Sequence, residues 1–289
     1  MELLPTLHRG LRHVLVLRGV SSAVIGIDGH PVHYYELRGT GRGPPIVMVH
    51  GLGGSANGFH KVLHPLAQHF SRVIVPDLPG NGFSPCPGDG LGTYAQLEIL
   101  IHFLEQVVAR PAFVVGNSLG GAMCITLASR RPDLVRGLGL VAPAGARVAE
   151  ERLEALFRSL RVTTRAEAVQ LTHRLFHRAP IGALLLAGDL QRVYSAAAVT
   201  AVLREQRPTD FLEPELLEKL QMPTLLLWGE SEKLLPFEGI DYFREHMPRH
   251  AEVHVVPGFG HVPQMEHPRK LVSHLVSFAG RSGLLLESG

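Results

Sequence analysis

The chain has 289 residues, of which 45% are hydrophobic, and its formal net charge is +2 at pH 7. This length suits one large α/β domain with an insertion, and the nearly balanced charge provides no bulk attraction to nucleic acid. Two cysteines cannot form a disulfide framework, and neither metal-ligand spacing nor an apolar run of transmembrane length is present, so we expect no metal and no cofactor.

The first 20 residues combine apolar and basic side chains. The apolar set has nearly helical spacing and is interrupted by basic residues: Leu3, Leu4, Leu7, Leu11, Val14 and Leu15, with Arg9, Arg12, His13 and Arg18. This pattern predicts an amphipathic helix, which either packs on the domain or makes peripheral membrane contact through residues 1–18. Without a basic n-region and a small-residue cleavage site it does not resemble a signal peptide, so we expect a cytoplasmic protein.

Short apolar runs alternate with helical patterns up to residue 141. Two strands are expected within 24–37 around an Asp28-Gly29 turn, a hairpin signal. Further strands are expected at 46–50, 72–76, 112–116 and 135–141, and helices at 56–69, 93–109 and 119–131. Strands that are almost continuously apolar and alternate with helices favour a parallel sheet covered on both faces.

The alternation stops at Pro143 and resumes near residue 212. The stretch between is helical, with helices expected over 150–160, 165–176 and 196–204. We interpret 144–211 as an inserted helical cap, 21–143 and 212–280 as the core, and 281–289 as a frayed tail. After the cap we expect strands at 224–228 and 252–256 and helices at 236–247 and 268–279. Apolar cap residues either form the cap's own core or line a pocket.

A serine occupies the turn between one predicted strand and the next helix. The segment Gly116-Asn117-Ser118-Leu119-Gly120 follows the apolar run 112–115. A G-x-S-x-G between strand and helix is typical of a nucleophile elbow, in which the serine lies on a strained turn. The alternative is a tight glycine turn without catalytic role.

A nucleophilic serine needs a base and an orienting carboxylate. His261 is the candidate base, because it lies in a glycine-rich loop after the last predicted strand. The candidate acid is Glu232, with Glu230 as the alternative, both in the loop after strand 224–228. Five other histidines, His8, His13, His173, His177 and His267, are expected at the solvated surface.

Two backbone N–H groups are expected to form the oxyanion hole. One belongs to Leu119, directly after the serine, and the other to Leu52, in the loop after strand 46–50. His50 at the end of that strand is expected to brace the loop.

These residues resemble the α/β-hydrolase superfamily over about residues 24–280. Five segments carry the resemblance: His50-Gly51-Leu52-Gly53-Gly54, Asp77-Leu78-Pro79-Gly80-Asn81-Gly82-Phe83-Ser84, Gly116 to Gly121, Trp228-Gly229-Glu230-Ser231-Glu232, and Gly260-His261 through Glu266-His267-Pro268. The chain departs from the usual pattern at Glu232, where Asp is common, and at Asn81, where His is common. Within the superfamily, residues 140–145 and the cap are similar to monoacylglycerol-lipase-type serine hydrolases.

The resemblance implies an α/β-hydrolase fold and a serine hydrolase with a Ser118-Glu232-His261 triad. The expected substrates are medium-to-long acyl esters such as monoacylglycerols, cleaved through an acyl-enzyme intermediate without a cofactor. One alternative is a carbon–carbon bond hydrolase of the meta-cleavage type, although those enzymes usually carry Trp where this chain has Val262. Another is a binding module whose triad is degraded at Glu232.

Overall fold

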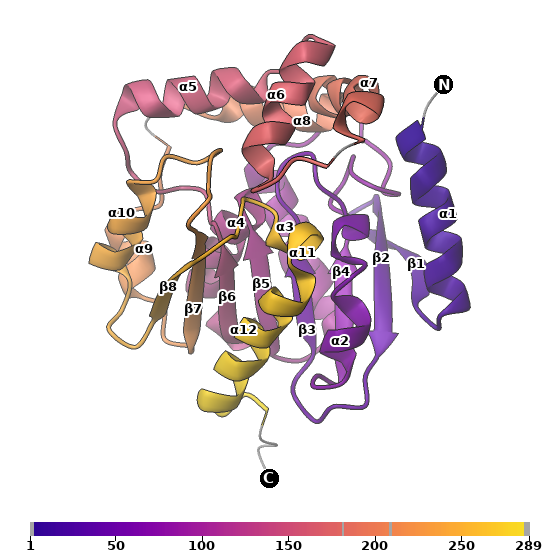
Figure 1. The fold of residues 1–289 in the computed structure, drawn as a ribbon. Helices are drawn as coiled ribbons and strands as arrows, with labels where there is room; N and C mark the ends of the chain where they lie inside the picture. The colour runs from indigo at the N-terminus through magenta and orange to yellow at the C-terminus, as the bar shows by residue number, and fades with distance from the viewer. Residues whose placement is uncertain (1–2, 181, 208–209, 286–289) are drawn as a thin grey trace.

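Eight strands form a single sheet in the computed structural model, which describes residues 3–180, 182–207 and 210–285. The strands lie in the order β1-β2-β4-β3-β5-β6-β7-β8 (Figure 1). Their bounds are β1 (Ser21–Ile27), β2 (His30–Arg38), β3 (Ile46–Val49), β4 (Arg72–Pro76), β5 (Ala112–Asn117), β6 (Val135–Val141), β7 (Thr224–Gly229) and β8 (Glu252–Val256). Strand β2 is antiparallel to β1 and β4, and the remaining pairs are parallel. The predicted mostly parallel eight-stranded sheet is confirmed.

The predicted hairpin joins β1 and β2 through two residues in the left-handed region. Asp28 has φ 49° and Gly29 has φ 80°. Positive φ at both central positions defines the type I′ turn, whose twist matches that of the flanking strands.

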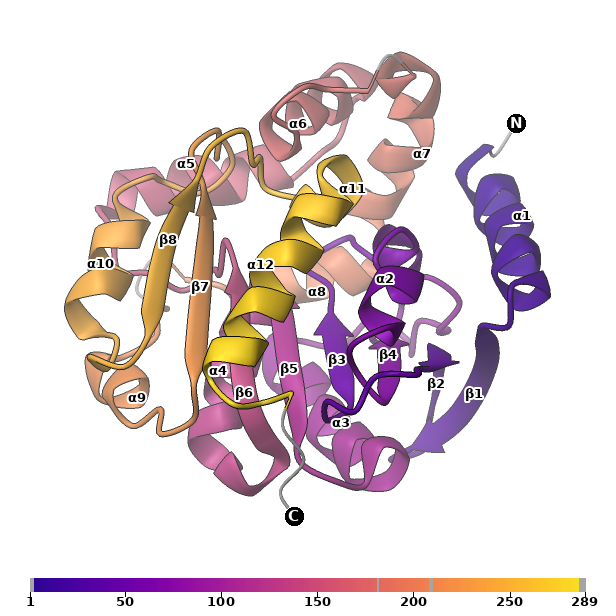
Figure 2. The ribbon, with the colours of Figure 1, turned by 60° about the horizontal axis from the view of Figure 1, so that its bottom comes forward.

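Helices cover both faces of the sheet, and the side chains of alternate strand residues pack into two separate hydrophobic cores. On β3, Val47 and Val49 belong to the core that includes residues of α3, α4, α9 and α10, whereas Ile46 and Met48 belong to the core that includes residues of α2 and α12. Figure 2 shows α2 and α12 on the same face of the sheet. The helix bounds are α2 (Leu63–Ala67), α3 (Thr93–Phe103), α4 (Leu119–Arg130), α9 (Pro214–Glu218), α10 (Gly239–His246), α11 (Pro263–Glu266) and α12 (Pro268–Arg281).

Helices α5 to α8 lie together across the top of the sheet in Figure 1, and we refer to them and the loops between them as the cap. Their bounds are α5 (Glu150–Leu160), α6 (Arg165–Leu175), α7 (Ala183–Ser195) and α8 (Ala197–Glu205). The sequence did not predict α7, because Gly188 interrupts its helical pattern. An added Cβ there would lie 3.3 Å from the Arg165 side chain, so the glycine allows α6 and α7 to pack closely.

The N-terminal segment forms α1 (Leu3–Leu17), which lies at one edge of the molecule beside α7 (Figure 1). Leu15 is buried, and the backbone N–H of Leu3 donates to Asp189 of α7 over 3.2 Å. Among the described residues, no helix has both the length and the apolar character needed to cross a membrane.

Three segments differ from the sequence prediction. The helix expected over 56–69 is replaced by a short 3-10 turn, η1 (Ala56–Phe59), and the five-residue α2, whose early Pro65 lacks a backbone donor. The helix expected over 93–109 changes at Phe103 into a π-helical turn over 104–108. The predicted frayed tail is wrong for its first part, because Leu284 is 3% exposed and packs against Gly137; residues 286–289 lie outside the described residues.

Candidate active site

Ser118 occupies the sharp turn between β5 and α4. Its backbone has φ 57° and ψ −123°, a conformation that non-glycine residues rarely adopt. A side chain at Gly116 would collide with the carbonyl of Gly120, and one at Gly120 would lie 2.5 Å from the carbonyl oxygen of His50. The glycines of the G-x-S-x-G motif are therefore required by close backbone approach on both sides of the serine.

His261 and Glu232 form a buried hydrogen-bonded pair. The distance between His261 Nδ1 and Glu232 Oε2 is 2.8 Å. The other carboxylate oxygen accepts hydrogen bonds from the N–H groups of Leu234 and Leu235, at 2.7 and 3.0 Å. Glu230, the alternative acid, is exposed. With Nδ1 directed to a carboxylate, Nε2 remains the nitrogen able to accept a proton.

The loop after β3 packs directly against the serine. A Cβ added to Gly51 would lie 2.9 Å from Ser118 Cβ, and Leu52 and Leu119 line the same cavity as Ser118 and His261. The expected bracing role of His50 is borne out by its contacts. Its Nε2 accepts from the N–H of Leu78 over 3.0 Å, and its Nδ1 lies 2.8 Å from the Gly51 carbonyl oxygen.

Burial lowers the pKa of His50 below its ordinary value of 6.5. The unfolded chain therefore takes up a proton at this residue as the pH falls below 6.5, whereas the folded protein does not, and stability decreases in that range. In His50→Gln we expect this pH dependence to be weaker by up to about 1.4 kcal/mol per pH unit. Urea unfolding at pH 5, 6 and 7 measures both slopes, and equal slopes would contradict the assignment.

Cap residue Tyr194 contacts the loop after β3. Its hydroxyl donates to the Leu52 carbonyl over 3.3 Å, and its ring covers Gly53, where φ is +67°. Burial raises the pKa of Tyr194 to about 12, so the hydroxyl keeps its proton at neutral pH. The cap therefore contributes to positioning Leu52.

A second cap segment, residues 175–178, joins the two loops that carry Glu232 and His261. The His261 N–H donates to the Leu175 carbonyl over 3.0 Å. His177 Nδ1 lies 2.6 Å from Ser231 Oγ, and Glu266 accepts from the backbone N–H groups of His177 and Arg178. These contacts fix the cap to both loops at once.

Two histidines expected at the surface are not there. His177 is half-buried at the junction just described, and His8 lines the cavity around Ser118, where burial lowers its pKa. That prediction is wrong for both residues. The residues next to these two histidines in the chain do not indicate their burial, since each histidine contacts a segment that is distant in sequence.

The cavity around Ser118 has a volume of about 380 Å³ and a mostly apolar wall. Its lining comes from α1, the loop after β3, the cap and the His261 loop, and includes Leu4, Leu11, Phe157, Leu190, Tyr194 and Val262. Such a size and lining are typical of small-molecule sites. Among the described residues, no group of three His, Cys, Asp or Glu side chains could hold a metal ion.

Comparison with known proteins identifies the family. The family model described as the alpha/beta hydrolase fold matches residues 44–268. Lipase 3 of Moraxella sp. (strain TA144) is 27% identical over 84% of this chain and 78% of its own length. The monoacylglycerol lipase ABHD6 of Mus musculus is 26% identical over the same shares. The crystal structure of a membrane phospholipase A, a bacterial virulence factor, superposes with a TM-score of 0.84 at 27% identity, covering 98% of this chain and 93% of that one. The chain therefore belongs to the alpha/beta hydrolase fold family.

Proposed function

We propose that this protein hydrolyses carboxylic esters through a Ser118-Glu232-His261 triad. The observation that carries the proposal is the buried Glu232–His261 pair, whose histidine lines the same cavity as the strained Ser118. Hydrolase activity is common to the family, and the lipases among the relatives favour esters over other substrates.

In this mechanism His261 takes the proton of Ser118 while the serine oxygen attacks the ester carbonyl. Glu232 holds the imidazole and stabilises its cationic form. The N–H groups of Leu52 and Leu119 stabilise the oxyanion, and His261 then protonates the leaving alcohol. Water activated by the same histidine releases the acid from the acyl-enzyme.

The apolar wall beside Ser118, which includes Leu119 and Phe157, favours medium-to-long acyl esters, because burying each methylene contributes about 0.8 kcal/mol. Hydrolysis of p-nitrophenyl esters from two to sixteen carbons tests this proposal. We expect kcat/KM to rise with chain length and to peak at eight carbons or more. A peak at two to four carbons would contradict the acyl preference, and no turnover at any length would contradict the ester hydrolase itself.

We further propose that α1 makes peripheral contact with an anionic membrane surface. Leu7, Val14 and Leu17 share one side of the helix and are 56%, 46% and 75% exposed. The exposed Arg9 and Arg12 add positive charge, and α1 contains no acidic residue. Exposed apolar residues on one side of a helix and basic residues on another are typical of helices that bind in the interface of anionic bilayers.

Co-sedimentation with phosphatidylglycerol vesicles measures this contact. We expect Leu7→Ser/Val14→Ser/Leu17→Ser to bind at least about tenfold more weakly, since three exposed apolar side chains are removed from the interface. The control Phe237→Ser removes a side chain that is 46% exposed near α10, at the opposite edge of the molecule (Figure 1). Equal binding of the triple variant and the control would contradict the proposal.

A further inference from the structure

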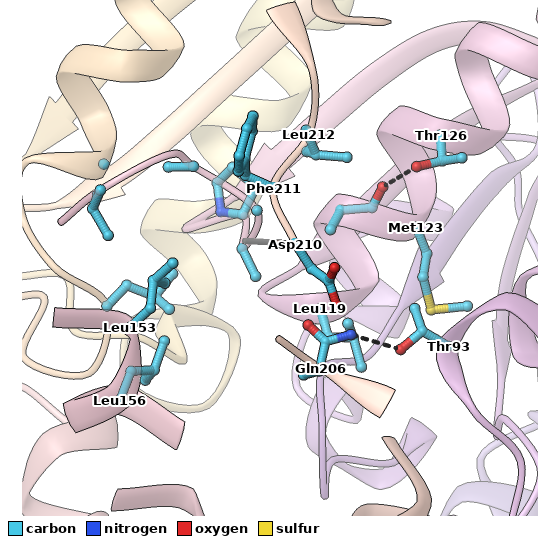
Figure 3. A pocket seen from close by; sticks show the side chains of 18 of the residues that line it. Thr93, Leu119, Met123, Thr126, Leu153, Leu156, Gln206, Asp210, Phe211 and Leu212 are labelled. Carbon is cyan, nitrogen blue, oxygen red and sulfur yellow. Dashed lines mark hydrogen bonds between the residues drawn. The ribbon is translucent and has the colours of Figure 1, made fainter. Parts of the chain in front are cut away.

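A second cavity of about 400 Å³ lies between the cap and α4. Figure 3 shows Leu153 and Leu156 of α5 on one side of it, Met123 and Leu119 of α4 on the other, and Phe211 beside them. Neither Ser118 nor His261 contributes to its lining. The cavity is therefore distinct from the one that surrounds the serine.

The two cavities share part of their walls. Six residues line both: Leu119, Ala144, Leu156, Phe157, Gln206 and Leu235. Leu119 directly follows Ser118, so the shared wall begins one residue from the proposed nucleophile. A carbonyl group bound at Ser118 would lie at the boundary between two chambers of similar volume.

The second cavity suits an apolar guest, because most of its wall is apolar and several of its polar side chains already have partners. Gln206 Nε2 donates to Thr93 Oγ1 over 3.3 Å, and Thr126 Oγ1 donates to the Ala122 carbonyl over 3.1 Å (Figure 3). Asp210 accepts from the N–H of Arg207 over 2.8 Å. A hydrocarbon chain would contact Met123, Leu153 and Phe211 and leave these bonds intact.

The chemistry of ester cleavage assigns one arm of the substrate to each cavity. The leaving oxygen must lie next to His261, which supplies its proton. His261, Val262 and Met265 line only the first cavity. The alcohol arm therefore occupies the first cavity, and the acyl arm, on the other side of the carbonyl carbon, extends past Leu119 into the second.

We propose that the second cavity is the acyl-chain subsite, and that the substrates carry apolar groups on both sides of the ester bond. This inference rests on the proposed ester hydrolysis. It narrows the substrate class from acyl esters in general to esters whose alcohol is also apolar, such as a lipid with a second hydrocarbon chain.

Two ester series and two cavity-filling variants test the assignment. One series varies the acid from butyryl to decanoyl with a fixed ethyl alcohol, and the other varies the alcohol from ethyl to decyl with a fixed butyryl group. Thr126→Phe fills the second cavity, and Leu190→Trp in α7 fills the first. Thr200→Phe is the matched control, since Thr200 is also half-buried on a helix, donates to the carbonyl four residues earlier over 3.1 Å, and lines neither cavity.

For Thr126→Phe we expect kcat/KM for the decanoyl ester to fall at least about tenfold while the butyryl ester changes little, because an overfilled pocket rejects only the longer chain. Leu190→Trp should show the reverse pattern, with the loss confined to decyl butyrate. Thr200→Phe should resemble the wild type in both series. If Thr126→Phe slows both acyl lengths equally, or if Leu190→Trp causes the acyl-length loss, the assignment is wrong.

A binding measurement separates this inference from the proposed function. In the Ser118→Ala background, a fluorescent long-chain fatty acid should bind, and a second filling variant, Ala122→Leu, should weaken its binding at least about fivefold. Fatty-acid binding that depends on Ala122, in a wild type that cleaves no ester, would overturn the proposed function but leave the subsite supported. Binding that neither Ala122→Leu nor Thr126→Phe weakens would overturn the subsite alone.

Discussion

Replacing Ser118 with alanine is expected to lower kcat for ester hydrolysis by about 10⁴-fold to 10⁶-fold. The substitution removes the attacking oxygen, and no other group can form the acyl-enzyme. The oxyanion hole and the cavity remain, so a small residual rate above the uncatalysed reaction should persist. Because alanine keeps the Cβ of serine, the turn at φ 57° keeps a side chain of similar size.

Ser55→Ala is the matched control for this experiment. Ser55 lines the same cavity but lies on the loop after β3. We expect it to keep activity within about threefold of the wild type, since the hydroxyl has no part in the mechanism. A fluorophosphonate should label the wild type and Ser55→Ala but not Ser118→Ala. Labelling of Ser118→Ala, or turnover at the wild-type rate, would exclude the triad.

Replacing Asp77 with alanine should lower the free energy of unfolding by about 3–5 kcal/mol. This is the largest loss of stability that we predict for a single substitution. Asp77 is fully buried and accepts from the N–H groups of Ala56 and Phe83, at 2.6 and 3.0 Å. Its Oδ2 also lies 2.7 Å from Nδ1 of the buried His33. Alanine would leave three donors unpaired, those of the buried Ala56 and His33 and of the half-buried Phe83, each costing up to about 1–3 kcal/mol before relaxation.

Urea unfolding monitored by circular dichroism measures this loss. The control Asp133→Ala removes an exposed carboxylate paired with Arg131, and we expect it to cost less than about 1 kcal/mol. Asp77→Asn should lie between the two, since an amide retains one acceptor oxygen. A loss below about 1 kcal/mol for Asp77→Ala would mean that water or a shifted side chain replaces the carboxylate.

Strands and most helices could be predicted from local patterns alone. Strands β4, β6 and β8 have the predicted bounds, because each is a short apolar or alternating run between turn residues. Helix α7 was missed since Gly188 and the polar residues around it weaken the pattern. Its stability comes from packing against α6, which a window of sequence does not contain.

The choice between the two candidate glutamates needed the tertiary structure as well as the sequence. Glu230 and Glu232 lie two residues apart in the same loop, and the sequence favoured Glu232 with Glu230 as the alternative. In the folded protein Glu230 is exposed, whereas Glu232 is buried against His261. The difference arises because the N–H groups of Leu234 and Leu235 hold one carboxylate oxygen and turn the other toward the histidine loop.

The sequence by itself determined the sheet, the elbow at Ser118 and the identity of His261 as its candidate base, because each depends on short-range backbone geometry that glycines and apolar runs encode. Only the tertiary structure decided how the cap contributes to the candidate active site. The contacts of Tyr194 with the Leu52 loop, of His177 with Ser231, and of the second cavity with Leu119 join segments far apart in the chain. Long-range packing selects such pairs, and no local pattern of residues specifies them.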